Sequence, residues 1–322
     1  MISSVEIKGL RGIREGKLED LTPLVILVGP NGSGKSTVLD ALHVGAAFDP
    51  GAAVNEVIQR HKGVDRGMRW FLYRADPRDP ATITICSDAG GSRICKLTLQ
   101  ENNVRCQWKA REMAIAGHDT APPEGGKFSN RRQELEGVPE VRLVEARVFE
   151  NRPPLHQMYT RAVEQGHRTE AKSMIAEVVP RVKDLEILTE GDMPIVHLVF
   201  EDYSVPVAFA GDGVYSLVRL ALELASRHQG VVLFEEPEVH QHPAAICQTV
   251  RAILAAIRRD IQVVLTTHSL ELIDYILAES TDDDLGKLSL YRLQLDDGAL
   301  SSYRMPGSEV EFARSQIEDD LR

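Results

Sequence analysis

The sequence has few cysteines, no long apolar run and no internal repeat. Its four cysteines form no C-x-x-C pair and have no set of histidines nearby, which argues against a disulfide framework or a zinc site and favours reduced thiols (Cys86, Cys95, Cys106 and Cys247). No apolar segment approaches the roughly 20 residues that cross a bilayer. The chain opens on an alternating strand pattern and shows no signal peptide. We therefore expect a cytoplasmic protein without a membrane partner.

Basic residues are outnumbered by acidic ones. The chain has 37 Lys and Arg against 48 Asp and Glu, a net charge of −11, which argues against a protein whose whole surface coats nucleic acid. Local basic clusters could contact nucleic acid, and the simpler interpretation is that they form a solvated surface. These clusters are Arg60, His61, Lys62, Arg66, Arg69 and Arg74; Arg131 and Arg132; and Arg142, Arg147 and Arg152.

The 322 residues, 43 % of them hydrophobic, suffice for a large core. Buried-strand patterns alternate with helical patterns, which predicts an α/β fold with a parallel core sheet. Between residues 82 and 108, three strand-like runs separated by hairpin turns predict an antiparallel β subdomain. No heptad run is long enough for a coiled coil.

The segment Leu24–Thr37, LVILVGPNGSGKST, carries the clearest chemical motif. An apolar strand runs into a glycine-rich turn and then a helical pattern, the context that the phosphate-loop motif G-x-x-x-x-G-K-[ST] requires. Inward-facing backbone N–H groups and the helix N-terminus bind phosphate oxygens. We expect Lys35 to reach the outer phosphates and the Ser36 hydroxyl to ligate Mg²⁺. The expected nucleotide contacts are Asn31, Gly32, Ser33, Gly34, Lys35, Ser36 and Thr37.

A second motif, Val231–Pro237, places two carboxylates after four apolar residues, the Walker B pattern. Such a carboxylate beside a phosphate loop can hold Mg²⁺, and the next one can activate water. We assign Glu235 to magnesium and Glu236 to the general base. Alone, such a pair is more often a solvated strand end. The phosphate loop before it and a third motif after it favour the catalytic interpretation.

A third motif, Val263–Ser269, ends a further buried strand with His268. A polar side chain at the tip of a neighbouring strand can sense the γ-phosphate. We therefore predict that His268 senses the γ-phosphate, and we count it with Glu236 among the catalytic residues.

The combined motifs resemble those of ABC-type ATPases, in the branch with SMC, RecF and the OLD (overcoming lysogenization defect) nucleases. The stretch Glu236–Pro243 is similar to the E-P-E-x-x-L-H-P signature of OLD-like ATPases, and Thr266–Ser269 matches their switch-histidine strand. The segment Ile7–Gly12 resembles their opening strand, and this resemblance implies that Arg11 contacts the nucleotide.

The resemblance implies an ABC ATPase head formed by one domain, residues 1–322, with a helical lobe at roughly 112–194 between Walker A and Walker B. It also implies a head-to-tail homodimer in which a signature loop, roughly L-S-G-G-Q, completes the partner's ATP site. The matching stretch is Phe209–Val214. Here Gly211 replaces the expected serine, which bears on the rate of hydrolysis. Gly213 and the following helix N-terminus keep backbone N–H groups for the γ-phosphate.

Within this branch, the sequence resembles an OLD-like ATPase head without its own effector. Too few residues follow His268 for a Toprim domain, and the absence of a coiled coil argues against an SMC protein. We expect an ATPase that uses ATP and Mg²⁺, dimerises on ATP and controls a separately encoded effector, a nuclease or toxin, in phage or plasmid defence. The alternatives are a RecF-like DNA repair ATPase and an ABC transporter ATPase subunit.

Overall fold

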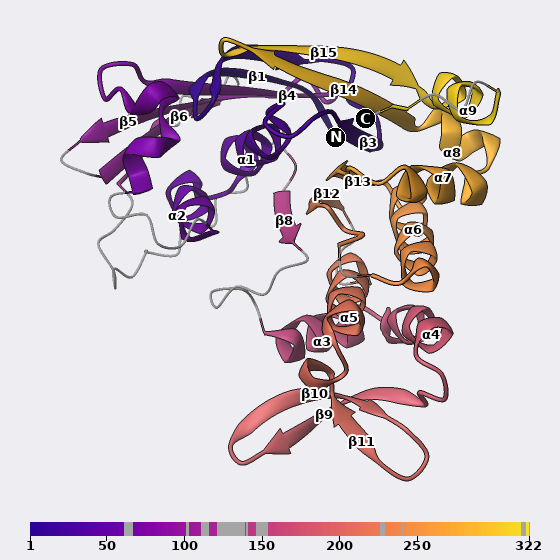
Figure 1. Cartoon of the computed structure of the whole chain (residues 1–322). Coiled ribbons are helices and arrows are strands. Elements are labelled where there is room, and N and C mark those ends of the chain that lie inside the picture. The colour runs from indigo at the N-terminus through magenta and orange to yellow at the C-terminus, as the bar shows by residue number, and fades with distance from the viewer. Residues whose placement is uncertain are drawn as a thin grey trace.

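The computed structural model describes residues 1–60, 67–100, 103–110, 116–120, 139, 141–145, 154–225, 229–239, 241–316 and 320–321. One mixed sheet of twelve strands, in the order β7-β6-β5-β4-β1-β2-β15-β14-β3-β13-β12-β8, forms the body of the protein. A separate sheet has the order β11-β10-β9. Figure 1 shows the large sheet across the top and the small sheet at the far end of a projecting lobe. The predicted α/β class is confirmed.

Parallel strands form the core of the large sheet, as predicted. Every residue of β3 is buried, and strands covered on both faces are typically continuous apolar runs. The parallel pairing places Glu235 opposite Thr266 and Thr266 opposite Leu27, so three strand ends that carry site residues meet at one edge. The parallel strands are β14 (Leu288–Asp296), β3 (Leu24–Val28), β13 (Ile261–Thr266), β12 (Gly230–Glu235) and β8 (Val141–Glu145).

Antiparallel strands extend this sheet on the β14 side. The predicted hairpins between residues 82 and 108 are present, and the structure adds that they continue the core sheet through β1 and β2. The antiparallel strands are β1 (Ile2–Leu10), β2 (Ile13–Leu18), β4 (Ala81–Ser87), β5 (Ser92–Gln100), β6 (Asn103–Ala110), β7 (Ala116–Thr120) and β15 (Ala299–Pro306).

Helices cover the two faces of the large sheet with separate apolar clusters. On one face, Val38 and Leu42 of α1 (Lys35–Ala46) belong to the same buried cluster as Ile7. On the other face, Val250 and Ile253 of α6 belong to a second cluster. The remaining helical segments of the body are α2 (Pro50–Arg60), η1 (Gly67–Phe71), η2 (Tyr73–Ala75), α6 (Pro243–Ile257), α7 (Leu270–Glu279), α8 (Asp282–Gly286) and α9 (Gly307–Gln316).

The projecting lobe has its own apolar core, which includes Met158, Ile175, Leu198 and Val218. Part of the predicted lobe range, 112–194, lies outside the described residues, so its bounds stay a prediction; this core continues past residue 194 into α5. The lobe consists of α3 (Leu155–Glu164), α4 (Arg168–Val178), β9 (Asp184–Glu190), β10 (Met193–Val199), β11 (Ser204–Pro206), η3 (Val207–Phe209) and α5 (Asp212–Ala225).

Two expectations from composition can be compared with the structure. Among the helices in the described ranges, none is long and apolar enough to cross a membrane. Cys86, Cys95 and Cys247 are free thiols. Burial raises the pKa of Cys95 to about 12, so this thiol stays protonated and unreactive at neutral pH.

Candidate nucleotide site

The phosphate loop joins β3 to α1 and owes its shape to glycine. Gly29, Gly32 and Gly34 have φ values of +140°, +81° and +94°, which side chains with a Cβ rarely adopt. A Cβ on Gly29 would also lie 2.5 Å from the carbonyl oxygen of Leu293. Gly34 precedes α1 and makes no side-chain cap. The first N–H groups of the helix therefore have no capping side chain and are placed to bind an anion.

Lys35 is 7 % exposed, and its side chain bonds to the backbone of the loop. Its Nζ donates to the carbonyl oxygens of Gly29, at 2.7 Å, and Pro30, at 3.0 Å. Burial lowers the pKa of Lys35, and the negative charges of Glu236 and Glu235 act in the opposite direction. The ammonium thus lies in the field of both Walker B carboxylates, as the motif predicts.

Glu236 follows β12 in a backbone conformation that is rare for a residue with a side chain. Its φ is +47°, which costs of order 1 kcal/mol or more and persists where surrounding contacts fix it. The Glu236 N–H supplies such contacts, because it donates to the carbonyl oxygen of Thr266, at 3.1 Å, and to its hydroxyl, at 3.3 Å. Neighbouring β13 therefore holds the turn that carries Glu236.

His268 lies beside Glu236. Its Nε2 is 3.7 Å from Oε1 of Glu236, and the two side chains are 35 % and 40 % exposed. Ser269 begins α7 by accepting a hydrogen bond from the Leu272 N–H at 3.1 Å, so His268 sits at a fixed strand-to-helix turn. Both side chains are partly open to solvent.

The donor types at this edge suit Mg²⁺. Ser36 in the first turn of α1 and Glu235 at the end of β12 both offer oxygen. Mg²⁺ in nucleotide sites takes one or two protein oxygens and completes its shell with phosphates and water. In the described part of the chain, no group of three or more His, Cys, Asp or Glu side chains could hold a metal. The assignment of Mg²⁺ to Ser36 and Glu235 stays a prediction.

Arg11 lies in the turn after β1 and forms an ion pair with Asp40 of α1, whose carboxylate is fully buried. The Arg11 backbone N–H also donates to the Phe71 carbonyl at 3.0 Å. Sequence reasoning missed Asp40, although a carboxylate among the apolar positions of this helix was a usable signal. The nucleotide contact of Arg11 stays a prediction.

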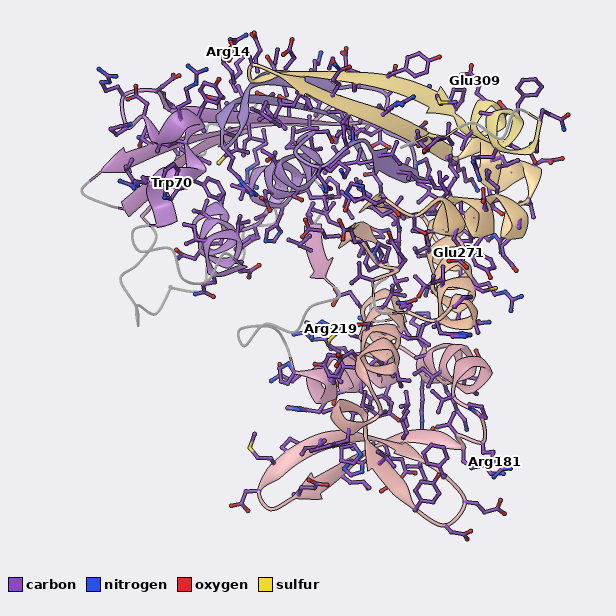
Figure 2. All side chains as sticks on the ribbon, viewed as in Figure 1. Arg14, Trp70, Arg181, Arg219, Glu271 and Glu309 are labelled. Atoms are coloured by element: carbon purple, nitrogen blue, oxygen red, sulfur yellow. The ribbon has the colours of Figure 1, made fainter. Side chains whose placement is uncertain are left out.

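The structure does not bring Gly211 and Gly213 to the phosphate loop of the same chain. They lie at the start of α5 in the lobe, well separated in Figure 1 from β3 and α1. Figure 2 gives the same separation, with Arg219 of α5 far below Arg14 of β2. Gly211 has φ +94°, and a Cβ there would meet no atom within 4 Å. The preceding Phe209 is 83 % exposed.

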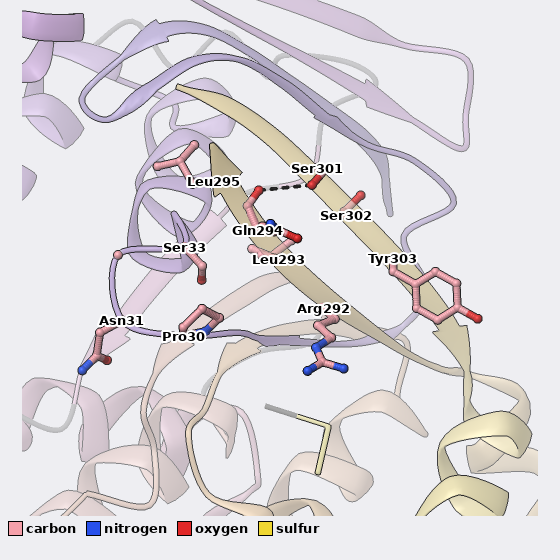
Figure 3. Close-up of a pocket in the computed structure, with 11 residues that line it drawn as sticks. Pro30, Asn31, Ser33, Arg292, Leu293, Gln294, Leu295, Ser301, Ser302 and Tyr303 are labelled. Carbon is pink, nitrogen blue, oxygen red and sulfur yellow. Dashed lines mark hydrogen bonds between the residues drawn. The ribbon is translucent and has the colours of Figure 1, made fainter. Parts of the chain in front are cut away.

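A pocket of about 580 Å³ opens beside the phosphate loop, and sequence reasoning missed it. Figure 3 shows Pro30 and Ser33 along one wall and Arg292 and Tyr303 of the β14–β15 hairpin along the other. The buried Ser33 hydroxyl makes no hydrogen bond within the described residues. The full lining is Pro30, Asn31, Gly32, Ser33, Arg292, Leu293, Gln294, Leu295, Ser301, Ser302 and Tyr303.

Family models match two consecutive parts of the chain. One, described as "AAA domain, putative AbiEii toxin, Type IV TA system", matches residues 115–274, and a second, described as "AAA domain", matches residues 4–111. Two uncharacterized proteins of Methanocaldococcus jannaschii are similar in sequence. MJECL11 is 29 % identical over 113 residues, 35 % of this chain and 98 % of its own length. MJECL10 is 23 % identical over 219 residues, 62 % of this chain and 95 % of its own length.

Solved SMC heads share the fold. The SMC head bound to the C-winged helix domain of ScpA aligns with a TM-score of 0.60 and 13 % identity, over 95 % of this chain and 98 % of that one. The Pyrococcus furiosus Smc head domain with an extended coiled coil, bound to the C-terminal domain of ScpA, aligns with a TM-score of 0.57 and 12 % identity, over 99 % of each chain. At these identities the likeness concerns the fold, and the predicted ATPase-head architecture is confirmed.

Proposed function

We propose that this chain, two parts of which match AAA-domain family models and whose fold is that of an SMC head, binds ATP with Mg²⁺ and hydrolyses it at a site that a second copy completes. The convergence of the phosphate loop, the Walker B carboxylates and His268 at one sheet edge carries the proposal. Lys35 lies in the field of Glu235 and Glu236, and His268 is 3.7 Å from Glu236.

In this proposal each group has a task. Backbone N–H groups of the loop and Lys35 bind the β- and γ-phosphates. Ser36 and Glu235 would hold Mg²⁺, which would supply positive charge against the negative charge that develops on the phosphate oxygens. Glu236 orients the attacking water and accepts its proton. His268 donates to the γ-phosphate and keeps Glu236 in place.

A second copy supplies the missing donors in this proposal. Gly211 precedes α5 and faces open space, and Gly213 lies in the first turn of α5. In a head-to-tail dimer they approach the partner's γ-phosphate through backbone N–H groups. The neighbouring Phe209 ring is exposed and available for contact with the second copy.

Sedimentation of the Glu236→Gln variant with ATP, ADP or no nucleotide tests the proposal. We expect ATP turnover to fall about 100-fold or more, because the general base is lost, and dimers to accumulate with ATP alone. The control is Glu271→Gln, an exposed glutamate of α7, which leaves turnover unchanged. If Glu236→Gln forms no ATP-dependent dimer, the proposal of a composite site is wrong. If the unmodified protein does not turn over ATP, the proposal of an ATPase is wrong.

We further propose a cytoplasmic, OLD-like ATPase that controls a separately encoded effector, a nuclease or toxin, in phage or plasmid defence. One finding supports a protein partner, because both aligned SMC heads are bound to ScpA domains. The defence role is supported by the family model that matches residues 115–274, described as "AAA domain, putative AbiEii toxin, Type IV TA system". Affinity capture with the Glu236→Gln variant from its native host, with and without ATP, tests this. The result expected is ATP-dependent recovery of the product of a neighbouring gene; recovery that ignores nucleotide contradicts ATP-controlled binding.

One observation favours a DNA repair role as the second candidate. The Arg69 guanidinium stacks 4.7 Å from the centre of the Trp70 ring, and this ring is half exposed. Exposed aromatic and arginine planes can stack on nucleobases. ATPase stimulation by linear double-stranded DNA, lost in Trp70→Ala, would favour this role, whereas turnover that does not respond to DNA would exclude it.

A further inference from the structure

Glu238 connects the turn after β12 to the loop that carries His268. Its Oε1 accepts a hydrogen bond from the Thr267 hydroxyl at 2.5 Å. It also accepts one from the backbone N–H of His268. Two strand ends of the site are therefore joined through one carboxyl group.

Thr267 extends this connection in both directions. It is fully buried, and its N–H donates to the carbonyl oxygen of Leu27 in β3 at 3.1 Å. Its hydroxyl also accepts from the Ser269 N–H at 2.9 Å. The His268 loop is thus tied to the phosphate-loop strand through Thr267 and to the Walker B turn through Glu238.

One oxygen atom of the Glu238 carboxyl group is buried. This atom, Oε2, has no hydrogen-bond partner in the described part of the chain. Burial and the nearby charge of Glu236 raise the pKa of Glu238, while the hydrogen bond from Thr267 lowers it. A partly buried carboxyl that accepts such a hydrogen bond can orient the neighbouring groups.

We propose that Glu238 is a positioning residue for hydrolysis. It holds His268 within reach of Glu236 through Thr267 and the His268 backbone, and it does not touch the nucleotide. The proposal rests on the proposed ATPase function. A shift of about 1 Å in a catalytic group can cost on the order of 100-fold in rate, so loss of this tie is expected to lower kcat.

A double-mutant cycle between Glu238 and His268 tests the proposal. We expect Glu238→Ala to lower kcat for ATP about 10- to 100-fold with KM for ATP changed less than about twofold. Glu238→Gln, whose amide oxygen can still accept both hydrogen bonds, is expected to keep kcat within about threefold. Glu238→Ala combined with His268→Ala is expected to be no slower than His268→Ala alone, because residues that act through one another are not additive. Additive losses, or equal losses in Glu238→Gln and Glu238→Ala, would overturn the proposal.

A matched pair at Thr267 covers the case in which Glu238→Ala fails to fold. Thr267→Val removes the hydroxyl, whereas Thr267→Ser keeps it. The expected result is a drop in kcat for valine and near-normal kcat for serine; similar kcat in both variants counts against the tie.

A spectroscopic readout separates this proposal from the ATPase proposal. The imidazole ¹H–¹⁵N signals of His268 in the protein without nucleotide are expected to shift in Glu238→Ala and Thr267→Val and to stay in place in Glu238→Gln and Thr267→Ser. Unmoved signals in all four variants reject the positioning role. If the unmodified protein hydrolyses no ATP, the ATPase proposal fails. The NMR measurement still tests whether Glu238 positions the His268 side chain.

Discussion

The phosphate loop and the segment Phe209–Gly213 are both expected to contact ATP, yet the fold treats them in opposite ways. In the loop, Ser33, Lys35 and Thr37 are buried, and Lys35 is bonded to two backbone carbonyls. In the second segment, Phe209 is 83 % exposed and Gly211 faces open space. The phosphate loop is held by contacts within the chain, whereas the Phe209–Gly213 segment is exposed.

This difference indicates where binding energy for a dimer can come from. The loop has few groups left to bury apart from those that meet phosphate. Covering an aromatic side chain contributes about 1.5–3 kcal/mol, and the Phe209 ring offers that surface to a second copy. The loop should therefore determine nucleotide affinity, and the Phe209–Gly213 segment should determine association.

The largest effect is expected from a substitution in the phosphate loop. Lys35→Ala removes the ammonium that binds the outer phosphates and leaves the Gly29 and Pro30 carbonyls without their donor. We expect ATP affinity to fall about 100-fold or more, roughly 3 kcal/mol, as is typical for a buried charge-assisted contact. Calorimetric titration with ATP measures it.

Lys17→Ala is the matched control, because this exposed lysine of β2 pairs with nearby Glu19. Its ATP affinity is expected to be unchanged. Normal ATP binding by Lys35→Ala would show that the loop does not determine nucleotide affinity.

The second largest effect is expected from a substitution in the Phe209–Gly213 segment. Phe209→Ala, in the Glu236→Gln background, is expected to weaken the ATP-dependent dimer about 10- to 30-fold, near 2 kcal/mol, through lost apolar burial. Affinity of the monomer for ATP should not change. Met193→Ala, at a site of 64 % exposure in the same lobe, serves as the control in sedimentation. Equal dimer affinity for the two variants would mean that the Phe209 surface stays outside the interface.

The same contrast explains how far the sequence predicts the structure. Local patterns predicted β3, the glycine turn and the Glu235–Glu236 pair, because strand, turn and helix signals there lie within a few residues. Contacts between distant segments were not predicted. The Glu238–Thr267 bond depends on strand order and register, which no local pattern determines. The β14–β15 wall of the pocket was missed for the same reason, and the Phe209–Gly213 segment was identified only through family resemblance.

An acid titration asks whether the body or the lobe is more sensitive to low pH. Asp284 of α8 is almost fully buried, and the Arg258 guanidinium holds the pKa of this carboxyl well below its usual range. A depressed folded-state pKa stabilises above the unfolded value, near 4, and this stabilisation is lost as pH falls below it. We expect Asp284→Asn to cost about 1–2 kcal/mol of unfolding free energy at pH 7 and a smaller amount near pH 2.

Asp184 of the lobe is the comparison site. Its pKa is also lowered, by backbone and Arg168 hydrogen bonds that outweigh the effect of burial, but the side chain is more exposed. Asp184→Asn is therefore expected to cost under about 1 kcal/mol. Urea unfolding at the two pH values measures both variants, and a larger cost for Asp184→Asn would assign the acid sensitivity to the lobe.

The smallest expected effect separates backbone strain from contact at Gly211. An alanine there meets no neighbouring atom, yet φ is +94°, so the substitution should lower the unfolding free energy by about 1 kcal/mol through strain alone. Gly286→Ala in α8 also enters open space without a positive φ and is expected to be neutral or slightly stabilising. Thermal unfolding of the two variants compares them directly. If Gly211→Ala is as stable as Gly286→Ala, the segment adjusts its backbone at no cost, and the exposed loop is not held ready for a partner.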